Sequence, residues 1–68
     1  MKEVKIDTEY IKLDQFLKLV NLVSSGGDAK FVIKSGDVLV NKEVVYERGK
    51  KIRKGDTVSI GENIFVVI

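Results

Sequence analysis

The pattern of apolar and polar residues divides the chain into a short strand, two helices and a run of further strands. Residues Glu3–Ile6 alternate polar and apolar side chains, which predicts a short edge strand. From Leu13 onward the apolar residues recur with the spacing of one helical face, so we predict a helix over residues 13–22. Its apolar stripe consists of Leu13, Phe16, Leu17 and Val20.

A second helix is predicted over Gly26–Ser35 from its end signals and its own apolar stripe. Ser25, followed three residues later by Asp28, resembles a capping box, in which the serine oxygen accepts a hydrogen bond from a free backbone N–H. Gly36 is well placed to end this helix in the left-handed conformation. The stripe consists of Ala29, Val32 and Ile33.

The remainder of the chain has the pattern of short strands separated by turns. The predicted order, β-α-α-β-β-β-β, indicates an α+β fold in which two short helices pack on a small, mostly antiparallel sheet. No linker or repeat interrupts it, so we expect one domain over residues 1–68. The predicted strands are Val38–Val40, Val44-Val45, Thr57–Ile60 and Ile64–Ile68, and the turns between them are Asn41–Glu43, Gly55-Asp56 and Gly61–Asn63.

The composition excludes several classes of function. Of the 68 residues, 44% are hydrophobic and 32% are charged, as in an ordinary globular domain. The chain has no Cys and no His, which excludes disulfides, zinc sites of the Cys/His kind and Ser–His or Cys–His nucleophilic pairs. We therefore expect a protein that is not an enzyme and that binds no metal or other cofactor.

The sequence predicts neither a signal peptide nor a membrane span. Lys2, Glu3 and Lys5 interrupt any apolar stretch near the N-terminus. The longest apolar run, Ile64–Ile68, is far shorter than a bilayer requires. We expect a cytoplasmic protein.

Positive charge is concentrated in one segment. The formal net charge is only +2, but residues Arg48–Lys54 hold five cations in seven positions and no acidic residue. This local positive field predicts one arm of a phosphate-binding surface. The alternative interpretation is a solvated loop that keeps the protein soluble.

Lysines on the two predicted helices form a second candidate surface. Lys30 and Lys34 are one turn apart and share a face of the second helix, while Lys12 and Lys18 flank the first helix away from its apolar stripe. If the helices form a hairpin, these four lysines converge into a surface that binds the phosphate backbone and not a base sequence. The alternative is that they form the solvated sides of two amphipathic helices.

The Gly26-Gly27 step is a candidate anion site. Backbone N–H groups and the positive end of the helix dipole favour a phosphate oxygen there, beside the hydroxyls of Ser24 and Ser25. The spacing matches neither a P-loop nor a dinucleotide fingerprint, so nucleotide hydrolysis is not implied. An ordinary serine-capped turn is the alternative.

The aromatic residues do not predict a platform for stacking single-stranded bases. Phe16 falls on a helical stripe and Phe65 in an apolar strand, so both are expected in the core. Phe31 lies off the apolar stripe of its helix, and Tyr10 and Tyr46 stay unassigned. A small protein–protein interaction adapter, docking through the sheet and an exposed Phe31 or Tyr46, is therefore the alternative to nucleic-acid binding.

Three motifs, in this order and spacing, resemble the S4 RNA-binding domain, which typically reads Arg-Leu-Asp-x-x-Leu, Ser-Arg-x-x-Ala and Gly-x-Val-x-Val-Asn-Gly. The resemblance covers residues 11–60. The Ser-Gly-Gly-x-Ala-Lys step and the Arg-Gly-Lys-Lys stretch are similar to the short stand-alone bacterial S4 proteins of the YaaA/YbcJ type. The matching residues are Lys12-Leu13-Asp14-Gln15-Phe16-Leu17, then Ser25, Ala29-Lys30 and Ile33, then Ser35-Gly36-Asp37-Val38-Leu39-Val40-Asn41.

The resemblance implies an αL motif, in which two helices and the following β-turn form a basic surface for structured RNA. By position, Lys12 matches the family's leading arginine, Ser25 the serine that opens the second helix, and Lys30 and Lys34 its basic positions. Lys42 follows the Val-Asn turn. The implied partner is ribosomal RNA or a ribosome assembly intermediate, bound by a monomer.

The sequence departs from the family pattern at two places. Gly26-Gly27 stands where the family has an arginine, which removes one phosphate contact. Lys42 stands where the family has a glycine, which argues against a simple type I′ hairpin there. The RNA-binding residues expected from the charge pattern and the resemblance together are Lys12, Lys18, Ser25, Gly26, Gly27, Lys30, Lys34, Lys42, Arg48, Lys50 and Lys51.

Overall fold

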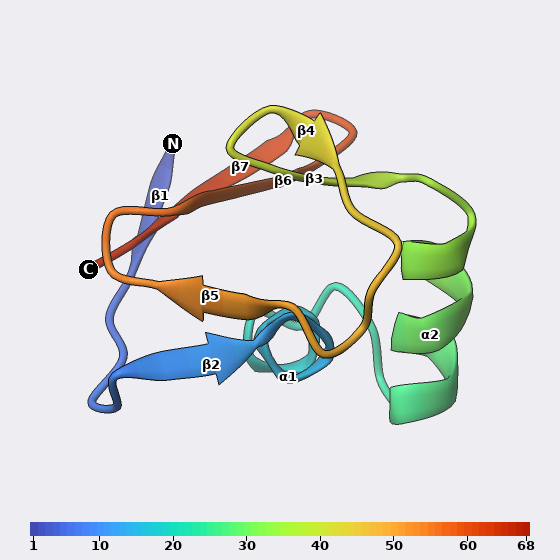
Figure 1. Cartoon of the computed structure of the whole chain (residues 1–68), viewed down its shortest axis with the longest axis horizontal. Coiled ribbons are helices and arrows are strands. Elements are labelled where there is room, and N and C mark those ends of the chain that lie inside the picture. Colours follow the sequence, from blue (N-terminus) through green and yellow to red (C-terminus); the bar gives the residue numbers. More distant parts are fainter.

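Two helices and seven strands make up the fold in a computed structural model, which describes residues 1–68 (Figure 1). Neither helix is long and apolar enough to cross a membrane. The elements are β1 (Lys2–Val4), β2 (Tyr10–Lys12), α1 (Leu13–Leu19), α2 (Gly26–Lys34), β3 (Val38–Val40), β4 (Glu43–Val44), β5 (Lys51–Arg53), β6 (Thr57–Ile60) and β7 (Asn63–Val67).

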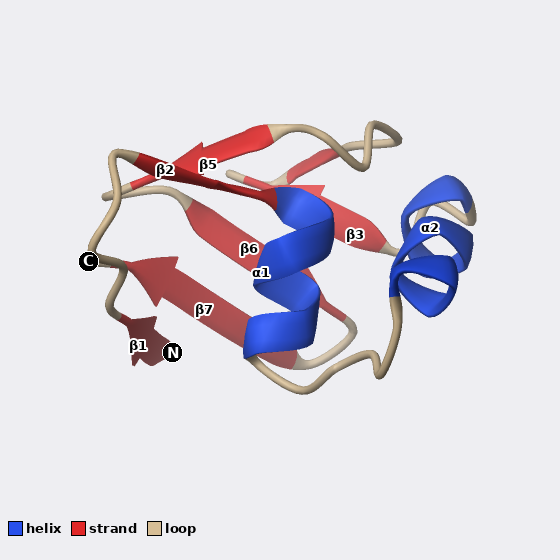
Figure 2. Cartoon of the chain, turned by 90° about the horizontal axis from the view of Figure 1, so that it is seen from below, coloured by secondary structure: helices blue, strands red, loops and turns tan.

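The strands form two sheets. The larger has the order β1-β7-β6-β3-β4, in which β1 runs parallel to β7 and every other pair is antiparallel. The smaller is an antiparallel pair of β2 and β5, called here the β2–β5 ribbon. The ribbon and α1 cover one face of the larger sheet, and α2 lies beside α1 at one end (Figures 1 and 2). The predicted α+β architecture, with two short helices on a mostly antiparallel sheet, is confirmed.

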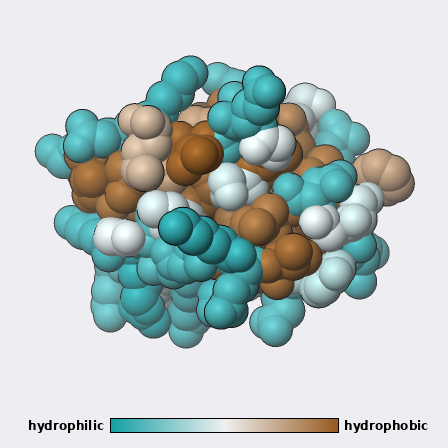
Figure 3. Space-filling view, turned by 90° about the horizontal axis from the view of Figure 1, so that it is seen from above, coloured by the Kyte–Doolittle hydropathy of each residue, from teal (hydrophilic) through white to brown (hydrophobic).

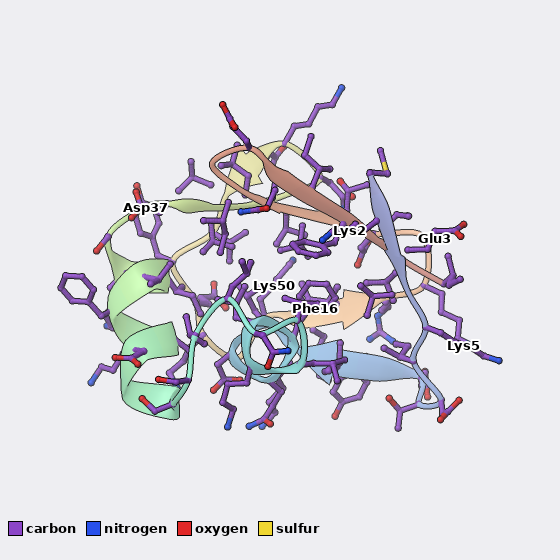
Figure 4. The ribbon with its side chains drawn as sticks, turned by 180° about the vertical axis from the view of Figure 1, so that it is seen from behind. Lys2, Glu3, Lys5, Phe16, Asp37 and Lys50 are labelled. Carbon is purple, nitrogen blue, oxygen red and sulfur yellow. The ribbon has the colours of Figure 1, made fainter.

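The core lies between the larger sheet and α1. Phe16 on α1 and Phe65 on β7, both expected to be buried, pack edge to face with their ring centroids 5.9 Å apart (Phe16 in Figure 4). Ile52 of β5 is also fully buried, so the ribbon closes the core on one side. The remaining core residues are Ile6, Leu13, Leu17, Ala29, Ile33, Val38, Val40, Val58 and Val67.

Helix α1 ends three residues earlier than the apolar spacing predicts. Asn21 has a φ of 60°, in the left-handed region that asparagine tolerates better than most residues. Its N–H donates to Lys18 O, and the N–H of Leu22 donates to Leu17 O, both at 3.1 Å. This is a Schellman ending with asparagine in the place of the usual glycine. The apolar spacing predicts a longer helix because Val20 and Leu22, which lie beyond the last helical residue, still pack against the core.

Helix α2 begins and ends at the predicted signals. The Ser25 side chain accepts a hydrogen bond from the Asp28 N–H at 3.2 Å, and Gly36, with a φ of 81°, follows the last turn. In a capping box the side chain at the third helical position also accepts the backbone N–H of the N-cap residue, but the Asp28 side chain makes a different contact. The Asp28 carboxylate accepts from the Ser24 hydroxyl at 2.9 Å, so this carboxylate is tied to the connection between the helices.

Three features of the β region differ from the prediction. Strands β2 and β5 were not predicted, and β5 lies within the basic Arg48–Lys54 segment, for which a solvated loop was the alternative interpretation. The β3–β4 turn has two residues, Asn41 and Lys42, with φ of 51° and 72°. Positive φ at both central residues is the pattern of a type I′ turn, so the expected departure from that turn is wrong. As a consequence, β4 begins at Glu43 and not at Val44.

Candidate nucleic-acid interface

The β2–β5 ribbon presents a basic outer face. Its register places Lys12 opposite Lys51, Ile11 opposite Ile52, and Tyr10 opposite Arg53. Because side chains alternate along a strand, the isoleucine pair faces the core, and the other two pairs face outward. Three exposed cations therefore lie on one side of a sheet only two strands wide.

Tyr10 organises two of these cations. The Lys51 ammonium lies 4.9 Å from the centroid of the Tyr10 ring, and the Arg53 guanidinium carbon lies 5.6 Å from it. Such contacts favour the cation over the ring face and hold both basic groups close to the ribbon. Arg53 also lies 3.5 Å from the carboxylate of the exposed Glu9. Arg53 lies in the basic Arg48–Lys54 segment expected from the sequence, whereas no role was expected for Tyr10, because its proximity to the two cations depends on an unpredicted strand pair.

The facing lysines of the ribbon are electrostatically unfavourable. Lys12 and Lys51 are direct cross-strand partners, and neither makes an ion pair. Like charges directly opposite each other destabilise a sheet. An anion bound between them removes the repulsion and gains attraction from both, so this pair has the chemistry of a phosphate site.

The segment before β5 is fixed to the start of α1. The Leu13 N–H donates to Lys50 O at 2.8 Å, and the Asp14 N–H donates to Arg48 O at 3.0 Å. Arg48 Nε lies 3.3 Å from Oδ2 of Asp14, whose residue is only 7% exposed. Arg48 is therefore partly committed to a structural ion pair. Lys50 and Lys51 remain exposed on the same segment.

The helix lysines do not converge through a helix hairpin. In Figure 1 α1 is seen end-on while α2 lies across the view, so the helices cross steeply instead of running antiparallel. Lys30 and Lys34 are both exposed on α2, as expected from their spacing. Lys18 is half-buried in the last turn of α1. The helix hairpin, on which the convergence of these four lysines depended, is therefore not formed.

The start of α2 is open but carries an acidic residue. A Cβ atom added at Gly26 would meet nothing within 4 Å, and one at Gly27 would meet only Ser25 Oγ at 3.8 Å, so packing does not require either glycine. The Ser25 oxygen already accepts the Asp28 N–H. The Asp28 carboxylate in the first turn repels a phosphate, which weakens the anion site expected at this helix end.

Lys42 lies apart from the ribbon. It sits on the β3–β4 turn of the larger sheet, whereas the ribbon lies on the other side of that sheet (Figure 1). The neighbouring Asn41 side chain is occupied, since it donates to Asp56 at 3.0 Å and accepts from the Thr57 N–H at 3.0 Å. These bonds tie the turn to the start of β6 and leave only Lys42 free to contact a partner.

The outer face of the larger sheet is partly apolar. Figure 3 shows hydrophobic side chains among polar ones on this face. The register places Val44 beside Leu39 and Ile64 beside Ser59, and both Val44 and Ile64 are exposed by about 45%. Phe31 and Tyr46 are also exposed. No group of three or more acidic side chains lies close enough to hold a metal ion.

Comparison with known proteins identifies the family. Residues 4–68 match the S4 domain family. The chain is 49% identical over 57 residues to the probable ribosome maturation protein RlbA of Bacillus subtilis, with 84% of this chain and 80% of that protein covered.

Two solved structures share the fold. The solution structure of Escherichia coli YbcJ, described as revealing an αL motif involved in RNA binding, superposes with a TM-score of 0.75. The two chains are 30% identical, and the match covers 100% of this chain and 87% of YbcJ. Trimeric heat shock protein 15 of Vibrio cholerae has a TM-score of 0.69 at 19% identity; the match covers 82% of this chain but only 58% of that one, so it shows the fold alone. The resemblance seen in the sequence is confirmed, and this chain belongs to the S4 domain family.

Proposed function

We propose that this protein is a non-catalytic RNA-binding module that acts on ribosomal RNA or a ribosome assembly intermediate in the cytoplasm. The observation that carries the proposal is the outer face of the β2–β5 ribbon, where Lys12 and Lys51 face each other beside Arg53. The similarity to a probable ribosome maturation protein and to an αL protein described as RNA-binding supports it.

The proposed surface extends from the ribbon towards α2. Lysine neutralises phosphates as a point charge without demanding a particular base, so a surface of this kind recognises the shape and backbone of folded RNA. We propose that Lys50 extends the ribbon and that Lys30 and Lys34 form a second group on α2. Arg48, Lys18 and the Ser25–Gly27 step are proposed as secondary contacts, and Lys42 as a separate one. The protein acts as a monomer in this proposal.

The test is binding to structured ribosomal RNA fragments at about 50 and about 200 mM salt. A protein that neutralises about five phosphates loses affinity by several hundredfold over this range. The double variant Lys12→Gln/Lys51→Gln removes two contacts, so its salt slope is expected to fall by nearly 2. The matched control is Lys2→Gln/Lys5→Gln, which removes the same charge from exposed positions outside the ribbon. Salt-insensitive binding, or equal losses in the two double variants, contradicts the proposal.

A second candidate function, a protein-interaction adapter, is favoured by the apolar outer face of the larger sheet (Figure 3). The two functions differ in their response to charge reversal. Lys50→Glu/Lys51→Glu abolishes RNA binding under the first proposal. If the protein is an interaction adapter, Lys50→Glu/Lys51→Glu leaves binding of the protein partner unchanged, whereas Ile64→Ser on the partly apolar face abolishes that binding.

A further inference from the structure

A cleft lined by no basic residue lies between α2 and the connection that leads to it from α1. Its volume is about 500 Å³, within the range of about 300–1,000 Å³ that small-ligand sites occupy. Leu22, Val23 and Val32 supply its apolar wall, and Asn21, Asp28 and Phe31 line it as well. Asp28 is its one charged lining residue, so the cleft does not attract phosphate.

One side of the cleft is an exposed aromatic ring. Phe31 is 74% exposed, although a phenylalanine gains free energy from burial, and it lies three residues after Asp28 on the same face of α2. The sequence pattern had placed Phe31 off the apolar stripe, and the structure gives it no packing role in the core. A flat ring beside an apolar wall is a surface on which a planar ligand stacks.

The polar group in the cleft is an oriented acceptor. The Asp28 carboxylate accepts the Ser24 hydroxyl through Oδ2 at 2.9 Å, which orients it, while Oδ1 has no hydrogen-bond partner and Oδ2 keeps a second lone pair. A carboxylate pairs with two adjacent donors. Among the nucleobases, guanine offers such a pair on its Watson–Crick edge, N1–H and the 2-amino group, whereas uracil and adenine do not.

We propose that this cleft, bounded by Phe31 and Asp28, binds an unpaired guanine base of the RNA, which stacks on Phe31 while its Watson–Crick edge donates to Asp28. Unstacked bases held on aromatic rings and read along this edge are a common mode of RNA recognition. The inference rests on the proposed RNA-binding function and adds selectivity to it. Lys30, next to Phe31 in α2, and Lys34, one turn further on, are placed to hold the flanking phosphates.

The first test uses nucleosides, which carry no phosphate and therefore do not depend on the basic surface. Backbone amide resonances of the ¹⁵N-labelled protein are followed during titration with guanosine, inosine, adenosine and cytidine. Guanosine is expected to give saturable shifts at the residues around the cleft. It should bind at least about fivefold more tightly than inosine, which lacks the 2-amino donor. Absence of saturable shifts, or equal affinity for all four nucleosides, overturns the proposal.

Variants assign the binding to the cleft. Phe31→Ala and Asp28→Asn are each expected to abolish the preference for guanosine, whereas Tyr46→Ala, which removes another exposed aromatic ring, retains it. The amide spectrum reports at the same time whether each variant is folded. Preference for guanosine that survives Phe31→Ala contradicts the assignment.

A second test separates this inference from the proposed function. RNA hairpins that differ only in one unpaired nucleotide, guanine or uracil, are compared at several salt concentrations. Phe31→Ala should erase the preference for guanine and leave the salt slope unchanged, because the ring contacts no phosphate. Lys30→Gln/Lys34→Gln should lower the slope and keep the preference. Salt-dependent binding with no base preference overturns the cleft proposal alone, whereas no salt dependence with any hairpin contradicts the proposed function.

Discussion

Arg48 and Asp14, 34 positions apart in the sequence, meet at the start of α1, where Arg48 Nε lies 3.3 Å from Asp14 Oδ2. The other carboxylate oxygen of Asp14 accepts the Gln15 N–H at 2.8 Å. Together with the backbone bonds from Leu13 to Lys50 and from Asp14 to Arg48, this pair fixes the basic segment against the helix. The position of the β2–β5 ribbon therefore depends on a buried carboxylate.

Asp14→Ala is expected to destabilise the protein by about 1.5–3 kcal/mol, because it removes a buried acceptor of two charge-assisted hydrogen bonds. Arg48→Ala should cost less, about 0.5–1 kcal/mol, because the Arg48 side chain is half exposed and solvent screens its charge. Urea denaturation of the two variants measures the difference. Equal losses would show that the ion pair, and not the network around Asp14, accounts for the stability.

The facing lysines of the ribbon give opposite expectations for stability and for binding. Lys12→Gln removes the repulsion from Lys51 and is expected to raise the free energy of unfolding by about 0.2–0.5 kcal/mol, most clearly at low salt. The same change weakens RNA binding under the proposed function. Thermal unfolding at low and high salt measures the gain, which should shrink as salt screens the repulsion.

Lys51→Gln separates the effect of the lysine repulsion on stability from that of the contact with Tyr10. It removes the same repulsion but also the contact with the Tyr10 ring, which contributes about 0.5–1 kcal/mol at an exposed site. No net gain in stability is therefore expected from this variant. If Lys51→Gln stabilises as much as Lys12→Gln, the tyrosine contact contributes nothing.

Much of the fold could be predicted from local signals. The apolar spacing of both helices and the end signals at Ser25 and Gly36 act over a few residues, so the sequence displays them directly. The β2–β5 ribbon could not be predicted in this way. Each of its strands has three residues and one inward-facing isoleucine, which is too short a pattern to distinguish from a loop.

The candidate site was predictable in composition but not in arrangement. The cluster of cations at Arg48–Lys54 is visible in the sequence, but its pairing with Lys12 and Tyr10 comes from contacts between residues about 40 positions apart. The crossing of the helices likewise depends on how α1 and α2 pack in the tertiary structure and not on the sequence pattern of either helix. The sequence therefore indicated which residues carry charge, and the tertiary structure decided which of them meet.

Two phenylalanines are expected to differ sharply on truncation. Phe16→Ala removes a fully buried ring that contacts Phe65 and should cost about 3–5 kcal/mol, a large part of the stability of so small a domain. Phe31→Ala removes an exposed ring and should change stability by less than about 0.5 kcal/mol. Urea denaturation of both variants tests this contrast, and a large loss in Phe31→Ala would assign that ring a packing role.

Two glycines are expected to respond in opposite ways when each is replaced by alanine. Gly36 has a φ of 81°, and an added Cβ would lie 3.4 Å from the Tyr46 ring, so Gly36→Ala is expected to cost about 1–2 kcal/mol. Gly26→Ala, at an open position in the first turn of α2, should raise stability by up to about 1 kcal/mol because alanine favours the helix. The midpoints of thermal unfolding should move in opposite directions, and a loss at Gly26 would indicate a constraint that packing does not explain.

In the β3–β4 turn, Lys42 occupies a position with a φ of 72° that favours glycine. Lys42→Gly is expected to raise the free energy of unfolding by about 0.5–1 kcal/mol, since glycine adopts this conformation without the strain that a side chain adds. Lys42→Gln is the matched control, because it removes the same charge but keeps the Cβ, and it should leave stability unchanged. Urea denaturation of both variants separates the backbone effect from the charge effect. If Lys42→Gln stabilises the protein as much as Lys42→Gly, the gain comes from removing the positive charge and not from relieving backbone strain in the turn.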